Sequence, residues 1–162
     1  MTRNCKITGS VVYDECYSSF VNPWNILEKE GPFNTFSSTA FGDYRLSSFV
    51  LNGFFCYDHN LGFFTNHGDN HWWMIDLNRV VTVESIILII PYGEPYIKSS
   101  NIRLGNNASF TNNDVVFRVE KEPEKGMPFV IKLSSNYSGQ FLSIETNDVN
   151  YLGIGLIQII ET

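Results

Sequence analysis

The stretch WWMIDL at residues 72–77 decides how this chain folds. In an extended strand successive side chains point to opposite faces, so Trp73, Ile75 and Leu77 share one face and Asp76 lies on the other. A register slip of one residue would bury the aspartate in place of these apolar side chains, so the register is well specified. Because large aromatic side chains dominate core energetics, we expect both tryptophans to pack in the core or at the sheet edge.

Short apolar runs bounded by Gly, Asn, Pro or Ser recur along the chain, as is typical of strands in a sandwich or barrel. The predicted strands cover residues 72–77, 80–90, 115–119, 129–133, 141–144 and 154–160. The segment 24–30 is the best candidate for a helix, but it is short and stops at Gly31-Pro32. The sequence therefore predicts an all-β domain, in which loops are the expected place for a binding site.

Composition and charge exclude several classes of protein. With 162 residues, 43% of them apolar and 17% charged, the chain is long enough for one folded domain with a single core. Its net charge of −6, without a basic cluster, argues against nucleic acid and anionic membrane surfaces as partners, because Lys and Arg supply the affinity for both. The longest apolar run, 86–90, is too short to span a bilayer, so we expect no membrane insertion.

The cysteines, the glycosylation sequons and the first residues of the chain bear on whether the protein is intracellular or secreted. Cys5 and Cys16 could close a short loop and leave Cys56 unpaired, but no connectivity follows from sequence. The sequons at 107–109 and 136–138 weakly favour an extracellular or secreted context. The first residues lack the apolar core of a signal peptide, so the chain is either intracellular or a processed or excised piece of a secreted protein, and the second reading is favoured.

Several further segments join WWMIDL in a family resemblance. They are Asn25–Leu27, Thr35–Thr39, Leu51–Gly53, Val83–Ile89, Asn101–Gly105, Gly139–Ile144, Tyr151–Leu152 and Gly155–Ile160. In this order they resemble the F-type lectins (fucolectins) of the F5/8 type C (discoidin-like) superfamily, and the family's Trp-Trp-x-Val-Asp-Leu strand is the most specific match. The resemblance implies a jelly-roll β-sandwich of the galactose-binding-domain-like type over residues 25–162, with residues 1–24 as an N-terminal extension.

The same resemblance implies a function and a partner. Members of the family bind fucose or a related terminal sugar through loops at one end of the sandwich, so the expected partner is a glycan or glycoprotein. They are not enzymes. A single shallow sugar site binds surfaces strongly only in several copies, so an oligomer or a tandem array is a further expectation.

The family's sugar site uses a histidine, then an Arg-x-Asp motif, then a second basic residue. In this chain Pro91 stands at the first Arg and Gly93 at the Asp, while Lys98 keeps the last basic position. The nearest histidine is His67, one residue out of register, and His59 is next. The motif is therefore degenerate, and the sugar site is either rebuilt or lost.

Other residues of the same loop offer replacement chemistry. Tyr92 and Tyr96 are candidates for stacking on a sugar ring, and Glu94 is a candidate acceptor for sugar hydroxyls. The alternative is that the loop is ordinary solvated chain. The matching function is then a protein-interaction or structural domain that kept the fold and lost sugar binding.

The family also holds a structural calcium ion. Asn52 and Gln158 stand where the family has an aspartate and a glutamate, and Asp58 lies near Asn52 in sequence. Calcium prefers charged oxygen ligands, so amides at both positions weaken the expected affinity. Ca²⁺ is a possible cofactor, but it is not the favoured prediction.

The sequence also offers a rival set of metal ligands, but no catalytic motif. Cys56, His59, His67 and His71 are potential zinc ligands, but the last two lie in loop composition and not on one helical face. No nucleophile elbow, phosphate-binding glycine loop or His-Glu-x-x-His helix is present. The acids at 120, 122 and 124 alternate with Lys and Pro, which indicates a solvated loop. The sequence therefore predicts a binding domain and not an enzyme.

Overall fold

The structure is a computed structural model that describes residues 16–18, 24–42, 46–51, 54–56, 62–93, 96–147 and 151–162. Its helical segments are α1 (Ile26–Lys29), η1 (Ser47–Leu51) and η2 (Phe110–Asn112). Its strands are β1 (Cys16–Ser18), β2 (Asn34–Ser37), β3 (Phe54–Cys56), β4 (Phe63–Phe64), β5 (His71–Ile89), β6 (Asn101–Gly105), β7 (Asp114–Arg118), β8 (Pro128–Thr146), β9 (Gly153–Ile154) and β10 (Leu156–Glu161). The predicted all-β sandwich is confirmed.

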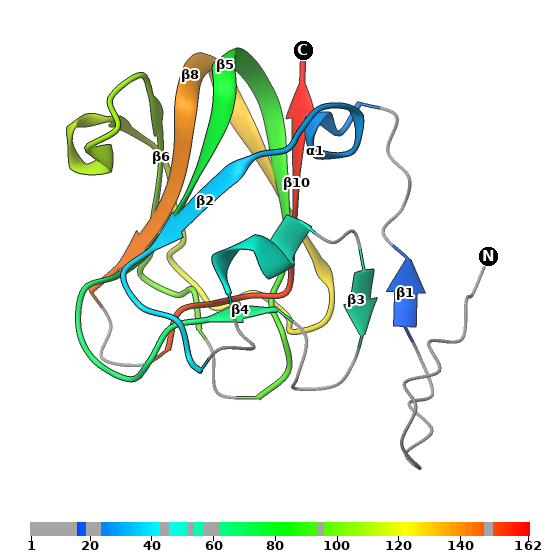
Figure 1. Ribbon diagram of the computed structural model, residues 1–162, viewed down its shortest axis with the longest axis vertical. Coiled ribbons are helices and arrows are strands. Elements are labelled where there is room, and N and C mark those ends of the chain that lie inside the picture. The colour runs from blue at the N-terminus through cyan, green and yellow to red at the C-terminus, as the bar shows by residue number, and fades with distance from the viewer. Residues whose placement is uncertain are drawn as a thin grey trace.

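Two bent strands of 19 residues each, β5 and β8, run through both layers of the sandwich (Figure 1). The first half of β5 pairs with the second half of β8, and their other halves pair with each other in the second layer. The first layer adds β2 on one side and β6 then β7 on the other, while β10 joins the second layer along β5. Both ends of β5 and β8 therefore meet at the same edge, opposite the bends.

The bends explain where the predicted strand boundaries were wrong. The sequence predicts separate strands at 72–77 and 80–90, but β5 continues through both because Asn78 adopts the left-handed conformation with φ 61°. Asn78 N–H donates to Asp76 Oδ1 at 2.8 Å, and its amide donates to Pro32 O at 3.0 Å. These bonds support a conformation that asparagine tolerates better than most residues.

The predicted strands 129–133 and 141–144 are likewise halves of one strand, β8. Gly139 in β8 passes so close to β6 that a Cβ there would lie 2.5 Å from Gly105 N. A glycine that looks like a turn signal in the sequence is needed here for the close approach of two strands.

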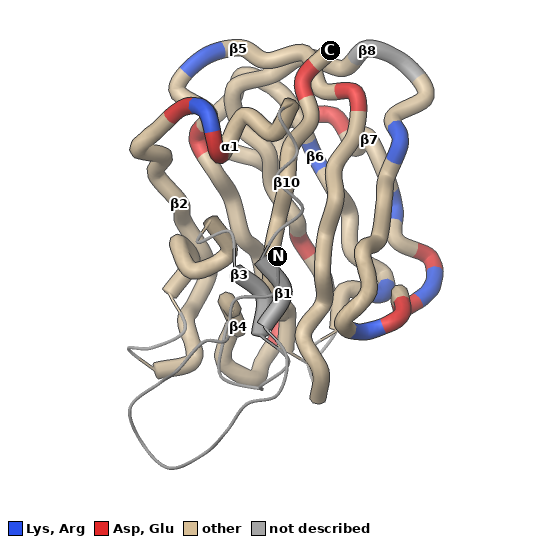
Figure 2. The backbone as a smooth tube through the Cα atoms, turned by 90° about the vertical axis from the view of Figure 1, so that its right-hand side faces the viewer, with Lys and Arg blue, Asp and Glu red and all other residues tan. Residues whose placement is uncertain are grey.

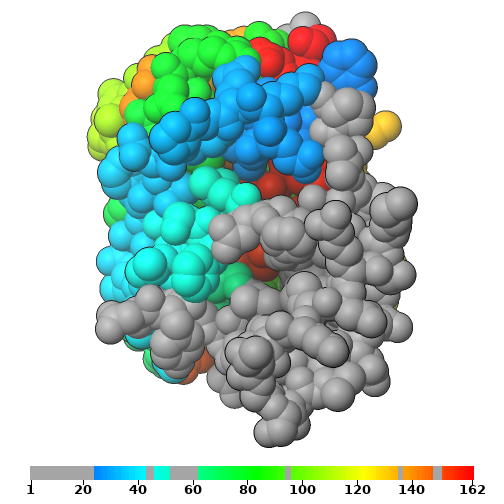
Figure 3. Space-filling model, turned by 45° about the vertical axis from the view of Figure 1, so that its right-hand side comes forward, coloured from blue at the N-terminus to red at the C-terminus, as the bar shows by residue number. Residues whose placement is uncertain are grey.

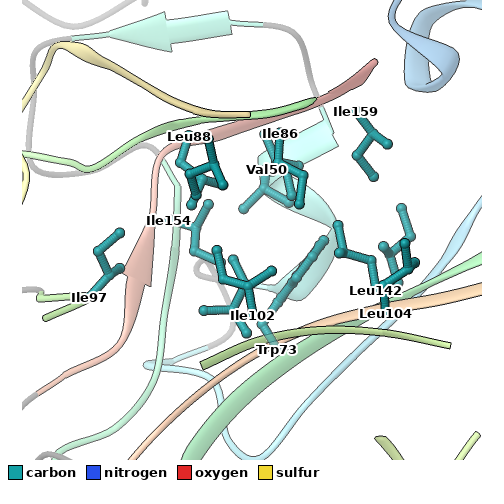
Figure 4. Packing of buried hydrophobic residues seen from close by; sticks show 14 of the residues in the cluster. Val50, Trp73, Ile86, Leu88, Ile97, Ile102, Leu104, Leu142, Ile154 and Ile159 are labelled. Carbon is teal, nitrogen blue, oxygen red and sulfur yellow. The ribbon is translucent and has the colours of Figure 1, made fainter. Parts of the chain in front are cut away.

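The core confirms the predicted register of the WWMIDL strand. Trp73, Ile75 and Leu77 are fully buried, whereas Asp76 is only half-buried and accepts a hydrogen bond from Gln140 Nε2 at 2.9 Å. Figure 4 shows Trp73 among Ile102, Ile86 and neighbouring side chains of the buried cluster. The indole Nε1 donates to Ser47 O at 2.9 Å, so this large ring is buried with its polar atom satisfied.

Trp72, next in the chain, lies on the outer face of the same sheet. It is half-buried, and its ring packs on Phe110 of η2 at 5.2 Å between centroids. Trp73 is in the core, as expected, whereas the expected place of Trp72 at the sheet edge is wrong, because β5 pairs there with β8 on one side and β2 on the other.

Residues 24–42 and 46–51 lie over the outside of the sandwich on the face shown in Figure 3. The predicted helix at 24–30 appears as the single turn α1, and its N-cap is the buried Asn25. Asn25 Oδ1 accepts from Leu27 N at 3.2 Å and from Ile159 N of β10 at 3.0 Å. This side chain therefore both caps α1 and attaches it to the sheet.

The first predicted feature, the N-terminal extension 1–24, lies largely outside the described residues, and its boundary stays a prediction. Within it β1 pairs with β3, so that Cys16 stands opposite Cys56 in the register. Cys5 lies outside the described residues.

Arg79 connects three parts of the chain at the end of the molecule that holds the bends. It donates to Glu30 Oε1 at 2.6 Å and to Glu161 Oε1 at 2.7 Å. Figure 2 shows charged residues gathering at this end, around the label C. The guanidinium lowers the pKa of both glutamates below the ordinary value of 4.5 by hydrogen bonding, with a smaller coulombic contribution.

These lowered pKa values predict a pH-dependent difference between the wild type and Arg79→Met. A carboxylate whose folded-state pKa is lowered stabilises the fold above its unfolded pKa, and this stability is lost as pH falls through the folded-state value. All three side chains are about a third or more exposed, so we expect a loss of at most about 1 kcal/mol at pH 7. Urea unfolding should show the two proteins converging in stability well below pH 4.5; a gap that widens in acid would contradict the assignment.

Candidate functional site

Loops from several parts of the chain lie at the edge opposite the bends, and we call their described parts the loop rim (Figure 1). It comprises the described parts of residues 38–42, 62–70, 90–100 and 151–152. Buried Thr65 fastens two of these segments, because its N–H donates to Leu152 O and its hydroxyl accepts from Leu152 N–H, each at 3.0 Å. Phe41 N–H donates to Phe64 O at 2.8 Å, which fixes a third segment to β4.

Three rings from distant parts of the chain meet on the loop rim. Tyr151 lies between Phe41, at 6.0 Å between centroids, and His67, at 5.3 Å, both in edge-on geometry. Phe41 is 40% exposed and His67 is exposed, while Tyr151 is half-buried. We call these residues the rim aromatic cluster. It presents apolar ring surface to solvent beside an imidazole that can donate a hydrogen bond.

Tyr96 extends this surface. Its N–H donates to Tyr151 O at 2.8 Å, and residues 96 and 152 form a parallel bridge. Its ring is 37% exposed, and Lys125 Nζ lies 4.2 Å from the ring centroid in a cation–π contact. Lys125 also donates to Gly93 O, so it holds both sides of the loop that contains Tyr96.

Lys98 is exposed, and the backbone beneath it is fixed by Glu122. Glu122 Oε2 accepts from Lys98 N–H at 2.8 Å and from Ile97 N–H at 3.0 Å, while the Ile97 side chain is fully buried. The segment 120–125, with its alternating charges, joins β7 to β8 (Figure 2). The expectation that its acids form only a solvated loop is therefore wrong for Glu122, which positions the chain at Lys98.

Removing this carboxylate should loosen the Lys98 segment. In Glu122→Ala, the amides of Ile97 and Lys98 lose their acceptor, so we expect their hydrogen exchange to accelerate by about tenfold or more, since a hydrogen bond to a charged group contributes about 1.5–3 kcal/mol. Exchange measured by NMR is compared with Glu120→Ala, which alters an exposed acid of the same segment. Equal exchange in the two variants would show that Glu122 does not hold the loop.

The structure places the remaining predicted residues differently. Tyr92 is half-buried, and its ring packs so tightly on Gly126, with φ +75°, that a Cβ there would lie 2.4 Å from the ring. Tyr92 therefore supports the loop, whereas the side chain of Tyr96 is exposed. His59 and Glu94 lie outside the described residues.

Only one of the three predicted calcium ligands lies in the described part of the chain. Gln158 is buried, at 4% exposure, in the middle of β10, and it offers a neutral amide instead of a charged oxygen. Asn52 and Asp58 lie outside the described residues. Among the described residues no group of three His, Cys, Asp or Glu could hold a metal ion. The calcium site therefore stays a prediction.

The zinc alternative has little support from its two described histidines. His71 is buried, and its Nε2 donates to Gly68 O at 2.7 Å, while His67 belongs to the rim aromatic cluster. His59 and the side chain of Cys56 lie outside what the structure describes.

Sequence reasoning missed Phe41, Tyr151 and Lys125. Tyr151 belongs to one of the segments that carry the family resemblance, where it is expected to be part of a strand. Nothing in the sequence links it to residue 41 or 67. Their proximity follows from the folding of the loops against β4 and β9, which are strands of two residues each.

Known proteins share the fold at low sequence identity. A fucolectin (F-lectin) from striped bass serum, Morone saxatilis, matches with a TM-score of 0.73 and 16% identity over 85% of this chain and 48% of that chain. A fucose-binding module of Streptococcus pneumoniae matches with a TM-score of 0.67 and 17% identity over 85% of this chain and 98% of that one. A family 32 carbohydrate-binding module of Clostridium perfringens, in complex with galactose, has a TM-score of 0.64 and 14% identity over 80% and 93%.

These likenesses concern the architecture. The chain spans about half the length of the striped bass lectin, at 48%. No protein-family model matches the chain, and no curated protein matches it in sequence. In the described residues no helix is long and apolar enough to cross a membrane.

Proposed function

We propose that this chain, a sandwich with the fold of lectins and carbohydrate-binding modules, is a non-catalytic carbohydrate-binding domain whose loop rim meets a terminal sugar. The observation that carries the proposal is the rim aromatic cluster, an exposed group of rings held by backbone bonds between loops. A sugar ring has apolar C–H faces that pack on aromatic rings and hydroxyls that need polar partners. The rim supplies both kinds of group.

Each rim residue has a role in this proposal. Phe41 and Tyr96 offer exposed ring surface, and His67 and Lys98 offer donors to sugar hydroxyls. Bonds from a cationic donor are about twice as strong as neutral ones, so Lys98 supplies the main polar contact. Fucose or a related terminal sugar fits because its methyl group needs an apolar wall, which Phe41 provides. The same proposal places the domain outside the cell, in an oligomer or a tandem array that presents several sugar sites.

A second candidate function follows from the degenerate motif. Pro91 and Gly93 stand where the family has its Arg and Asp, and Pro91 is buried. These replacements favour a protein-interaction or structural domain that no longer binds sugar.

A glycan array with the folded protein separates the two functions. The proposal expects binding to a set of glycans that share a terminal sugar, and isothermal titration with that free sugar then gives the affinity. If the protein melts cooperatively yet binds no glycan at multivalent presentation, the sugar-binding proposal is wrong and the second candidate stands.

Lys98→Ala should weaken this affinity by about 1–3 kcal/mol, the range for a lost hydrogen bond to a charged group. The matched control is Lys132→Ala, because Lys132 is also exposed but lies on β8 away from the loop rim. Titration of both variants with the same sugar checks the assignment. Equal affinities of the two variants would remove Lys98 from the site.

A further inference from the structure

A polar cleft lies at the end of the sandwich that holds the bends, opposite the loop rim. It has a volume of about 690 Å³ and lies between the η2 segment and the bend of β8. The lining residues on which the argument depends are Asn106, Asn107, Asn112, Asp114, Tyr137 and Ser138. Tyr137 and Ser138 pair with Val83 and Thr82 of β5, which places the cleft beside the bends (Figure 1). The volume is in the range of small-molecule sites.

Hydrogen bonds hold the walls of this cleft in place without any ligand. The buried side chain of Asn113 accepts from Asn107 N–H at 3.0 Å and donates to Asn107 O at 2.8 Å. Asn106 Oδ1 accepts from Gln140 N–H at 3.1 Å, which ties the same loop to β8. A site that is rigid before binding loses less conformational entropy when a ligand arrives.

The cleft also contains polar groups that the fold does not use. Within the described part of the chain, the side chains of Asn112 and Asp114 make no hydrogen bond or ion pair, and both are exposed to the cleft's solvent. An amide both donates and accepts, as a sugar hydroxyl does, and a carboxylate accepts from two hydroxyls. Tyr137, whose side chain is half-buried against the core, and Ser138 complete this lining.

The same lining argues against other ligands. No Lys or Arg is among the described residues that line the cleft, so a phosphate, sulfate or sialic acid would meet no opposite charge and would face Asp114. One carboxylate is fewer than a tight calcium site uses. The remaining chemistry, amides and hydroxyl groups with one carboxylate, fits an uncharged, hydroxyl-rich ligand.

We propose that this cleft is a second binding site, for a neutral saccharide unit, at the opposite end of the domain from the loop rim. It does not depend on the function proposed for the rim. A domain with both sites holds two sugars, or two branches of one glycan, at its two ends.

The test is a titration of the uniformly ¹⁵N-labelled chain, produced in bacteria so that Asn107 carries no glycan. Methyl glycosides of glucose, galactose, N-acetylglucosamine and L-fucose are added separately, up to about 10 mM, a concentration that would nearly saturate a site with a Kd of about 1 mM. The proposal expects saturable shifts of backbone amides in residues 105–114 and 137–140 with at least one sugar. In Asn112→Ala/Asp114→Asn the affinity at these amides should fall by about tenfold or more.

Asn147→Ala is the matched control, because Asn147 is exposed and follows β8 at the edge opposite the bends, away from the cleft. It should leave the cleft shifts unchanged. The absence of saturable shifts at the cleft with all four sugars overturns the proposal, as does equal weakening by Asn147→Ala. Shifts confined to the loop rim support the rim function and overturn this one, and shifts confined to the cleft do the reverse.

Discussion

Trp73→Ala is expected to lower the free energy of unfolding by about 3–5 kcal/mol, which is the usual loss for a large aromatic side chain in a core. Trp73 is fully buried and belongs to the hydrophobic core cluster, part of which is shown in Figure 4. The change also removes the bond from its indole to Ser47 O, which holds η1 on the sandwich. Urea denaturation followed by circular dichroism measures the effect.

The neighbouring Trp72 provides the control for this prediction. Trp72→Ala removes the same side chain from the outer face, where it is half-buried, so a clearly smaller loss is expected. If Trp73→Ala does not fold at all, Trp73→Phe gives a smaller cavity and a measurable midpoint. A larger loss from Trp72→Ala than from either Trp73 variant would contradict the register of β5.

Removing the rim aromatic cluster is expected to abolish measurable sugar binding. In Phe41→Ala/Tyr151→Ala, the central ring and an exposed neighbouring ring are lost together, so we expect a loss of about 3–4 kcal/mol, as for the main contacts of a binding site. The measurement is isothermal titration with the sugar that the glycan array identifies.

Phe36→Ala is the matched control for the cluster. Phe36 is 44% exposed, close to the 40% of Phe41, but it lies on β2 and not in a rim loop. It should bind sugar as the wild type does. If the double variant keeps wild-type affinity while its melting curve stays cooperative, the sugar does not bind on these rings.

The sequence predicts the middle of the sandwich well because alternation is a local property. The faces of Trp73, Ile75 and Leu77 follow from the period of two, and the packing of the two layers preserves them. It predicts the bends poorly. Asn78 and Gly139 look like ends of strands, yet each lets a strand continue, through a left-handed residue in one case and a close approach to Gly105 in the other.

In the candidate site, too, some positions could be predicted from the sequence and others could not. The place of Lys98, Tyr96 and His67 on the loop rim could be predicted from the sequence. The family resemblance aligns whole strands, and the loops between the strands are then placed with them. Phe41 and Tyr151 could not be predicted, since their contact depends on long-range loop bonds such as Phe41 N–H to Phe64 O. The hydrogen bonds from the Ile97 and Lys98 amides to Glu122 could not be predicted either, because Glu122 lies in a segment of alternating charges that is typical of a solvated loop.

The bent strands also determine how this domain acquires its structure. The pairing of β5 with β8 joins His71 to Thr146 and Ile89 to Pro128, and β10 then completes the second layer along β5. Contacts between residues so far apart in sequence form slowly, in milliseconds to seconds for sandwiches of this kind. Until then the apolar second half of β5 is an unpaired edge that can associate with another molecule. Refolding at low protein concentration should therefore give the higher yield of native domain.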